Sequence, residues 1–392
     1  MPTKTHARLR QELERELRAL EARRQRRTLA APAGVNLCSN DYLGLAENAE
    51  LHAAVVRAVE DTLRVGGTGS RLLSGHSAVW EALEEEFARF AGTEAALYFG
   101  SGYAANLGLL GALLGKDDLA FSDALNHASL IDGLRLSGAR KVVYPHLDLG
   151  ALESALREHA AAPGRKVIVT ESVFGMDGDC APIAQLLELG ERHGAGLIVD
   201  EAHATAVHGP AGRGLAAAAG AEQHAWAVLH MCGKALASAG AFVCGSELLK
   251  QMLVNRARPL IFSTAMPPYL TGQIRAALRL ARAMDAERAA LLERSRSFAA
   301  DLRSAGWNTA GSASQIVPVL IGGNGEAIAA AEHLQAAGFA VRPIRPPTVP
   351  EGTSRLRLSL TSAITAETLQ RLGAALKDWR EQRPQGAAVI HA

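Results

Sequence analysis

The sequence has few of the features that mark secreted, membrane or metal-binding proteins. Its four cysteines, Cys38, Cys180, Cys232 and Cys244, form no CxxC pair, so neither a disulfide framework nor a zinc site is indicated. No run of about 18 uncharged apolar residues occurs, and the first residues contain no apolar core of the signal-peptide type. We therefore expect a cytoplasmic protein whose cysteines are buried free thiols.

The chain also lacks an excess of charge of either sign. Lysine and arginine number 41 against 40 aspartates and glutamates in 392 residues, which gives no general attraction to nucleic acid or to an anionic membrane. Apolar residues make up 48% of the chain, which is typical of a globular protein. Its length suggests more than one domain. We expect an N-terminal helix and link at 1–45, a large domain at 46–270 and a small C-terminal domain at 271–392.

Short apolar runs alternate with helical patterns from about residue 50 to 320. The runs are Ala95–Phe99, Lys141–Tyr144, Lys166–Thr170, Leu197–Val199, Ala227–His230 and Ala241–Cys244. This alternation predicts an α/β fold with a mainly parallel sheet, and ligands of such a sheet bind outside the carboxyl ends of its strands. A smaller α+β unit should follow, with helices at 277–305, 325–337 and 366–381, strands at 316–321, 340–344 and 355–360, and a loose tail at 383–392.

The N-terminal residues 6–28 predict an amphipathic helix, because leucines recur at positions 9, 13, 17 and 20. Arginines occupy positions 23, 24, 26 and 27. Two interpretations of them stay open, namely contact with phosphate groups and a solvated helix end where cations are favoured.

Lys234 is the candidate around which the chemistry is organised. It follows an apolar run that ends at His230 and enters a stretch of small residues at 235–240. Desolvation there lowers the pKa of a lysine from about 10.4 and suits its amine to form a Schiff base with an aldehyde cofactor such as pyridoxal phosphate. A lysine after a glycine is also common on protein surfaces, so this motif alone leaves both interpretations open.

Asp200 and His203 follow another apolar run, at 195–199. A carboxylate at a buried strand end is costly unless a cation faces it. A protonated pyridine nitrogen would be such a cation and would make the ring an electron sink, while His203 would hydrogen-bond the ring's phenolic oxygen. The alternatives are a hydrogen-bonded strand end or half of a metal site, although no further ligands cluster nearby.

The loop FGSGYAAN, at 99–106, lies where an apolar run turns into a helical pattern. Free N–H groups at the start of a helix bind anions, which makes Ser101, Gly102 and Tyr103 candidates for a phosphate cradle. Such loops also simply join a strand to a helix. His127, in the segment NHAS, either lies flat on an aromatic ring or has a structural role.

Two further segments carry polar groups suited to anions. Arg355 and Arg357 lie two residues apart and therefore on one face of a strand, where an arginine offers a bidentate fork to a carboxylate. Ser263 and Thr264 precede a proline break, and hydroxyls near such breaks usually cap helices.

Eight motifs, in order, resemble the α-oxoamine synthases, which are fold-type I pyridoxal-phosphate enzymes that join an amino acid to an acyl-CoA with loss of carbon dioxide. The motifs are SNDYLGLA, GTGSRLLSGH, NHASLIDG, ESVFGMDGDCAP, DEAHATAVHG, GKALASAG, IFSTAMPP and RPPTVPEGTSRLRLSLTSA. The first and the last most resemble the branch that condenses L-alanine with pimeloyl-CoA in biotin biosynthesis. The resemblance implies a fold-type I transferase, with a mainly parallel seven-stranded sheet and a smaller α+β domain.

The resemblance also implies how pyridoxal phosphate is held. Lys234 would carry the cofactor as a Schiff base, Asp200 would face the pyridine nitrogen, His203 would reach the ring oxygen and His127 would stack on the ring. These four residues match the family's motifs position by position.

For the phosphate, the resemblance implies backbone N–H groups of Gly102 and Tyr103. It further implies that Ser263 and Thr264 reach the phosphate bound to the neighbouring subunit. The active unit would therefore be a homodimer that shares its two sites.

The implied substrate contacts are Asn40 and Arg357, which match the family's holders of the substrate carboxylate. Three positions depart from the family pattern: Met231 where Thr is usual, Gly175 where Ser is common and Ile364 where His is frequent. These departures keep two alternatives open. One is a related synthase that uses glycine or serine and another acyl-CoA, and the other is a protein of this fold without synthase activity.

Overall fold

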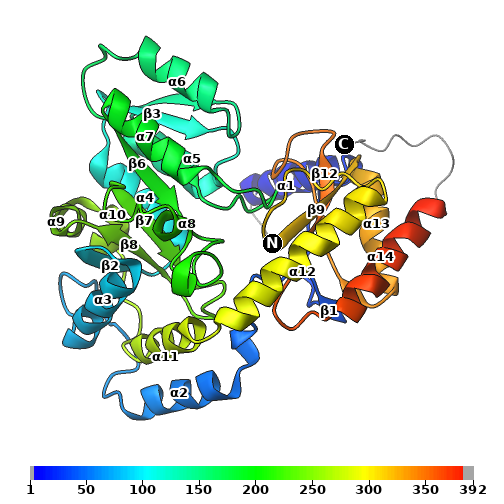
Figure 1. Cartoon of the computed structure of the whole chain (residues 1–392), viewed down its shortest axis with the longest axis horizontal. Helices are drawn as coiled ribbons and strands as arrows, with labels where there is room; N and C mark the ends of the chain where they lie inside the picture. Colours follow the sequence, from blue (N-terminus) through cyan, green and yellow to red (C-terminus); the bar gives the residue numbers. More distant parts are fainter. Residues whose placement is uncertain (1–3, 383–392) are drawn as a thin grey trace.

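The computed structural model describes residues 4–382, and its larger sheet has seven strands (on the left in Figure 1). The strands lie in the order β2, β8, β7, β6, β5, β3, β4, and only the pairings made by β8 are antiparallel. Their bounds are Ala95–Phe99 (β2), Leu119–Asp123 (β3), Arg140–Tyr144 (β4), Lys166–Glu171 (β5), Ala195–Asp200 (β6), Ala227–Met231 (β7) and Ala241–Gly245 (β8). The predicted fold class is confirmed.

Helices cover both faces of this sheet because its strands alternate apolar side chains between two cores. In β5, Val167 and Val169 enter one core and Ile168 enters the other. The first core includes residues of α4 (Gly102–Leu113), α5 (Ala128–Ser137), α9 (Glu247–Arg256) and α10 (Arg258–Ile261), and the second includes residues of α6 (Leu149–Glu158) and α7 (Ile183–His193). The other elements here are α2 (Ala49–Glu60), α3 (Ala78–Ala91), α8 (Leu215–Ala218) and the 3-10 helices η1 (Leu45–Glu47) and η2 (Pro210–Gly212).

A smaller antiparallel sheet follows in the chain. It contains β11 (Pro343–Ile344), β12 (Ser354–Ser359) and β9 (Ile316–Gly322) in that order. Its helices are α12 (Asp285–Ser304), α13 (Asn324–Ala336) and α14 (Ala366–Glu381). In Figure 1, α11 (Leu270–Arg282) lies below the large sheet and α12 runs from there to the small one.

The segment before the large sheet is bound to the small one. β1 (Val35–Asn36) pairs in parallel with β10 (Phe339–Ala340). The N–H of Ser359 donates to the carbonyl of Leu37, and the N–H of Ser362 donates to that of Tyr42. These bonds place the SNDYLG motif beside the end of β12.

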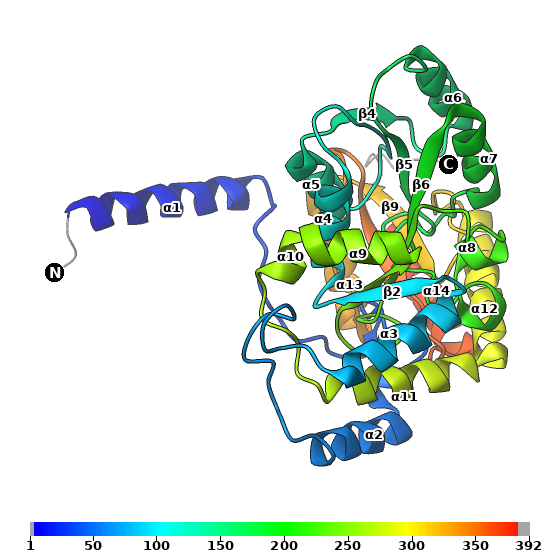
Figure 2. The same ribbon diagram turned by 90° about the vertical axis from the view of Figure 1, so that its left-hand side faces the viewer.

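The N-terminal helix is confirmed as α1 (Lys4–Ala22), shorter than predicted at its C-terminal end. Figure 2 shows it extending away from the rest of the chain. Leu9, Leu13 and Leu17 of its apolar stripe are 55%, 62% and 44% exposed. No helix in the described part of the chain has both the length and the apolar character needed to cross a bilayer.

Three elements differ from the sequence prediction. β3 was not among the predicted strands, because its sequence LAFSD ends in two polar residues although the whole strand is buried. The predicted long helix is two helices, α11 and α12, since the backbone leaves the helical conformation at Met284 and the chain changes direction there. The predicted strand at 340–344 is two short strands, β10 and β11, which pair with different partners. The predicted tail at 383–392 lies outside the described residues.

Candidate active site

Lys234 lies in a tight loop that follows β7. The N–H of Cys232 donates to the carbonyl of Gly240 over 2.9 Å, and the N–H of Ser238 donates to that of Cys232 over 2.9 Å. The loop thereby fixes the lysine, whose Nζ lies 2.7 Å from Nε2 of His203. Burial lowers the pKa of the Lys234 amine to about 8, although nearby carboxylates act in the opposite direction. The amine is therefore partly unprotonated near neutral pH, as a nucleophile or base requires.

Asp200 ends β6 and is buried at the carboxyl edge of the sheet. Its Oδ2 accepts a hydrogen bond from Nδ2 of Asn106 at 2.7 Å, and its Oδ1 accepts one from the N–H of Ala202 at 2.9 Å. Glu171, at the end of β5, is its partner in the strand register. This edge therefore concentrates acidic groups where a cationic ligand would be stabilised.

His203 connects the lysine to the N-terminal motif. Its Nδ1 lies 2.6 Å from the hydroxyl of Tyr42. Burial holds the pKa of His203 well below its ordinary value, with a further contribution from the Lys234 charge. The ring is consequently neutral, so one of its nitrogens donates a hydrogen bond and the other accepts one.

Arg357, on β12, reaches the same group of residues. Its Nη2 donates to Oδ1 of Asn40 at 3.1 Å and to the hydroxyl of Tyr42 at 3.3 Å, and its Nη1 donates to Oγ of Ser359 at 2.6 Å. Its Nε donates to the carbonyl of Gly175. A substrate carboxylate could replace the two Nη2 contacts and accept a bidentate pair of hydrogen bonds from the guanidinium group.

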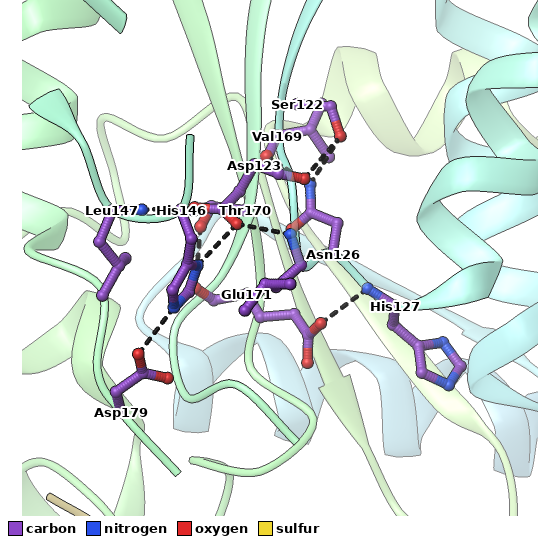
Figure 3. Close-up of polar contacts among 11 residues, drawn as sticks. Ser122, Asp123, Asn126, His127, His146, Leu147, Val169, Thr170, Glu171 and Asp179 are labelled. Atoms are coloured by element: carbon purple, nitrogen blue, oxygen red, sulfur yellow. Dashed lines mark hydrogen bonds and ion pairs between the residues drawn. The ribbon is translucent and has the colours of Figure 1, made fainter. Parts of the chain in front are cut away.

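His127 stands at the start of α5, beside the acidic groups. Its Nδ1 lies 2.7 Å from Oγ of Ser129, which also accepts a hydrogen bond from Asn106 at 2.9 Å. Its backbone N–H donates to Oε1 of Glu171 at 2.7 Å (Figure 3). Asn106 thus bonds to both Asp200 and the residue that orients His127.

The first turn of α4 provides donors for an anion. Ser101 caps the helix by accepting the N–H of Ala104 at 3.1 Å, so the N–H groups of Gly102 and Tyr103 stay without a helical acceptor. A Cβ on Gly102 would overlap Sδ of Met231. Glycine at this position therefore leaves room for the Met231 side chain between this turn and the end of β7.

These groups fit pyridoxal phosphate. The lysine amine suits the aldehyde of that cofactor, and the buried carboxylate suits its pyridine nitrogen. The neutral imidazole suits the phenolic oxygen, and the N–H groups of the first turn of α4 suit the phosphate. Met231 adds no donor to the phosphate region, since a thioether is only a weak acceptor. Residues 4–382 contain no group of three or more His, Cys, Asp or Glu side chains that could hold a metal ion.

Hydrogen bonds join the predicted site residues into two groups. Tyr42 connects Lys234 and His203 to Asn40 and Arg357, while Asn106 and Ser129 connect Asp200 to His127. The two groups are neighbours, because the charge of Asp200 acts on the Lys234 amine. Ser263 and Thr264 behave differently. Both are exposed, and neither side chain makes a hydrogen bond to the described residues. The chain by itself does not bring them to Lys234.

Sequence reasoning missed four polar residues that hold the site together: Tyr42, Asn106, Glu171 and Gln315. Gln315 donates to the carbonyl of His203 at 2.8 Å. Tyr42 and Asn106 lie inside motifs that were recognised, and Glu171 ends a strand next to that of Asp200, so those three carried a signal. Gln315 carried none, because its role depends on how the small sheet packs.

Comparison with known proteins identifies the family. The model of the aminotransferase class I and II family matches residues 32–376. The chain belongs to that family. The assignment agrees with the predicted resemblance to α-oxoamine synthases, and it makes this a pyridoxal-phosphate-dependent chain.

Several similar proteins carry the name 8-amino-7-oxononanoate synthase. The chain is 48% identical over 349 residues to the 8-amino-7-oxononanoate synthase of Geobacter sulfurreducens, covering 87% of this chain and 88% of the relative. The crystal structure of 8-amino-7-oxononanoate synthase from Francisella tularensis is 28% identical, with a TM-score of 0.77 over 89% of this chain and 98% of that one.

A second group of solved structures is also similar. The serine palmitoyltransferase of Sphingomonas wittichii is 31% identical, with a TM-score of 0.83 over 89% of this chain and 87% of that one. The solved structures that this chain resembles therefore include an 8-amino-7-oxononanoate synthase and a serine palmitoyltransferase.

Proposed function

We propose that this chain is an 8-amino-7-oxononanoate synthase, which condenses L-alanine with pimeloyl-CoA or another pimeloyl thioester. In this reaction, alanine loses its Cα proton, its Cα bonds to the acyl carbonyl carbon, and CoA leaves as the thiolate. The carboxylate then leaves as CO2, and a proton returns to Cα to give the amino ketone. The observation that carries the proposal is the 2.7 Å contact between Lys234 and His203, at a lysine on which the charge of Asp200 acts. The 48% identity to a synthase of that name supports it.

The chain's own residues bind and orient the amino acid. Arg357 and Asn40 would hold its carboxylate, replacing the contacts that they now make with each other. A carboxylate held at two points fixes the Cα–H bond relative to Lys234, and such positioning accounts for a large part of catalysis.

Lys234 is the proposed base that removes the Cα proton. Its pKa of about 8 leaves enough free amine at neutral pH. Pyridoxal phosphate, when bound, supplies an electron sink for the charge that forms at Cα. Asp200 would keep the pyridine nitrogen protonated, His203 would donate to the phenolic oxygen, His127 would cover one face of the ring, and Ser101, Gly102 and Tyr103 would surround the phosphate.

A panel of amino acids and acyl thioesters tests this function. The purified holoenzyme should release free CoA fastest with L-alanine and pimeloyl-CoA. Faster release with serine or glycine and another acyl-CoA would favour the related synthase, which the serine palmitoyltransferase neighbours make the second candidate. Cofactor bound without CoA release from any pair would favour a protein of this fold without synthase activity.

We also propose a homodimer. Ser263 and Thr264 are exposed in the single chain, and the large apolar side chains Leu72, Leu73 and Phe262 are exposed as well. A second copy would cover such side chains and let both hydroxyls reach the partner's phosphate. Light scattering should give twice the mass of the chain. The shared site is tested by mixing the variant Lys234→Ala with the double variant Ser263→Ala/Thr264→Ala. The mixture should regain activity at limiting cofactor, because a hybrid dimer has one site in which an intact Lys234 meets the intact hydroxyls of the other subunit.

Two coarser assignments complete the proposal. We divide the chain into three parts, 1–45, 46–270 and 271–392. Limited proteolysis tests this division, because cleavage between residues 265 and 285 should release two stable fragments.

We assign the protein to the cytoplasm, where its four free cysteines would stay reduced. Cell fractionation that finds the protein outside the cytoplasm would contradict this assignment.

A further inference from the structure

His146 forms an ion-pair bridge outside the group of residues described above. Its Nδ1 lies 2.8 Å from Oδ1 of Asp123, and its Nε2 lies 2.7 Å from Oδ2 of Asp179 (Figure 3). Phe174 packs against it with ring centroids 4.4 Å apart and planes at 87°. The imidazole therefore joins the end of β3 to the turn at 174–180 that follows β5.

The imidazole is a cation at neutral pH. Burial acts to lower the pKa of His146, but the hydrogen bonds and charges of Asp123 and Asp179 outweigh it and raise the pKa to about 10. Both ring nitrogens then donate, which matches two flanking carboxylate oxygens.

The two carboxylates depend on this cation to different degrees. Asp123 also accepts the backbone N–H groups of Leu125 at 2.8 Å and Leu147 at 2.9 Å. The Oδ1 atom of Asp179 is buried and has no hydrogen-bond partner among the described residues. Asp179 therefore relies on His146 for its side-chain hydrogen bond, and loss of the imidazole would leave it uncompensated.

The opposite side of the turn holds the small sheet. Arg355 pairs with Asp177, and Nε of Arg357 donates to the carbonyl of Gly175. The backbone of Gly178 lies so close to Ile316 of β9 that a Cβ there would overlap the Ile316 carbonyl. One short turn thus contacts His146 on the large-sheet side and both β12 arginines on the other.

We propose that His146 is a positioning residue for Arg357. It fixes the turn at 174–180 to the large sheet through Asp179, so that Gly175 and Asp177 hold the arginines of β12 at the amino acid carboxylate. The inference rests on the proposed function, because it assumes that Arg357 binds that carboxylate.

The experiment measures amino acid affinity in the holoenzyme. The dissociation constant of alanine, read from the change in cofactor absorbance, should rise at least tenfold in His146→Phe, which keeps the packing on Phe174 but donates no hydrogen bond. His146→Gln, which keeps one donor, should have a smaller effect. The KM for the acyl thioester should change less than twofold in both. His224→Gln, at an exposed histidine far along the chain, is the matched control.

A double-variant cycle separates positioning from general stability. If His146 acts through Asp179, then His146→Gln should add little to the alanine affinity change already caused by Asp179→Asn, since coupled residues are not additive. Full additivity would overturn the inference. Alanine affinity within twofold of wild type, with a lowered melting temperature in both His146 variants, would also overturn it by showing a structural role alone.

The two proposals fail in distinguishable ways. The binding measurement needs no CoA release, so it is repeated with any amino acid of the panel that changes the cofactor absorbance. Wild-type binding without CoA release from any pair overturns the proposed function while the His146 effect is still measured. If the wild type bound no amino acid, both proposals would be wrong.

Discussion

Glu171 and Asp200 are register partners at the carboxyl ends of β5 and β6, and both side chains are buried. Adjacent strands lie about 4.8 Å apart, so two ionised carboxylates at these positions would repel each other strongly. Burial, with the charge of Asp200 as a further cause, raises the pKa of Glu171 to about 8. Glu171 therefore holds a proton at neutral pH, and Asp200 is the carboxylate available to a cationic ligand.

This protonation predicts how the stability of the cofactor-free protein depends on pH. Glu171 has an ordinary pKa of 4.5 when unfolded and about 8 when folded, so the folded state binds more protons between these values and stability falls as pH rises through them. In Glu171→Gln, the melting temperature should change less between pH 5 and pH 8 than in the wild type. Glu188→Gln, at an exposed position, should keep the wild-type slope. An unchanged slope in Glu171→Gln would contradict the assignment.

Lys234→Ala should abolish turnover, because it removes both the attachment point of the cofactor and the base. We expect a loss of at least about a thousandfold in kcat, or roughly 4 kcal/mol of barrier. Borohydride reduction followed by peptide mass analysis should find the cofactor on Lys234 in the wild type and on no lysine in the variant. Lys377→Ala, at an exposed lysine, should behave as wild type. A reducible imine that survives in Lys234→Ala would mean that another lysine carries the cofactor.

Asp200→Asn should keep some bound cofactor but lose turnover by orders of magnitude, because a neutral amide does not hold the pyridine nitrogen in its protonated form. Absorbance gives the bound cofactor, and CoA release gives the rate. A rate within about tenfold of wild type, roughly 1.4 kcal/mol of barrier, would rule out this role for Asp200.

Met231→Thr should tighten cofactor binding. The side chain of Met231 contacts the first turn of α4 at Gly102, and a hydroxyl there could donate to a phosphate where a thioether cannot. A hydrogen bond to a charged group contributes about 1.5–3 kcal/mol, and the smaller side chain offsets part of that. We expect a Kd for pyridoxal phosphate about tenfold lower, measured by fluorescence titration of the apoprotein. Met252→Thr, on the exposed part of α9, is the control. An equal or higher Kd would place the phosphate elsewhere.

Arg357→Lys should raise the KM for alanine much more than it lowers kcat. Lysine keeps the positive charge but loses the fork that donates at once to Gly175, Asn40 and Ser359. An increase of about a hundredfold in KM is expected, or roughly 2.7 kcal/mol. Arg296→Lys, at an exposed surface pair, is the control. If the KM for alanine stayed within threefold while the KM for the acyl thioester rose, Arg357 would bind the other substrate.

The sequence by itself determined where most strands of the large sheet lie along the chain and which residues follow each of them. Alternating apolar runs predicted most of the large sheet, since a buried strand must be apolar whatever packs on it. Lys234, Asp200 and His203 could be found because each comes directly after such a run, and parallel strands present their carboxyl ends at one edge.

Only the tertiary structure decided which distant groups meet. Tyr42 reaches His203, Gln315 holds the His203 carbonyl, and the turn at 174–180 joins His146 to the arginines of β12. No local pattern encodes these contacts, because each depends on how the small sheet and the N-terminal segment pack against the large sheet. Local periodicity reports the burial of one segment, whereas the relative placement of two segments depends on the complementarity of both surfaces.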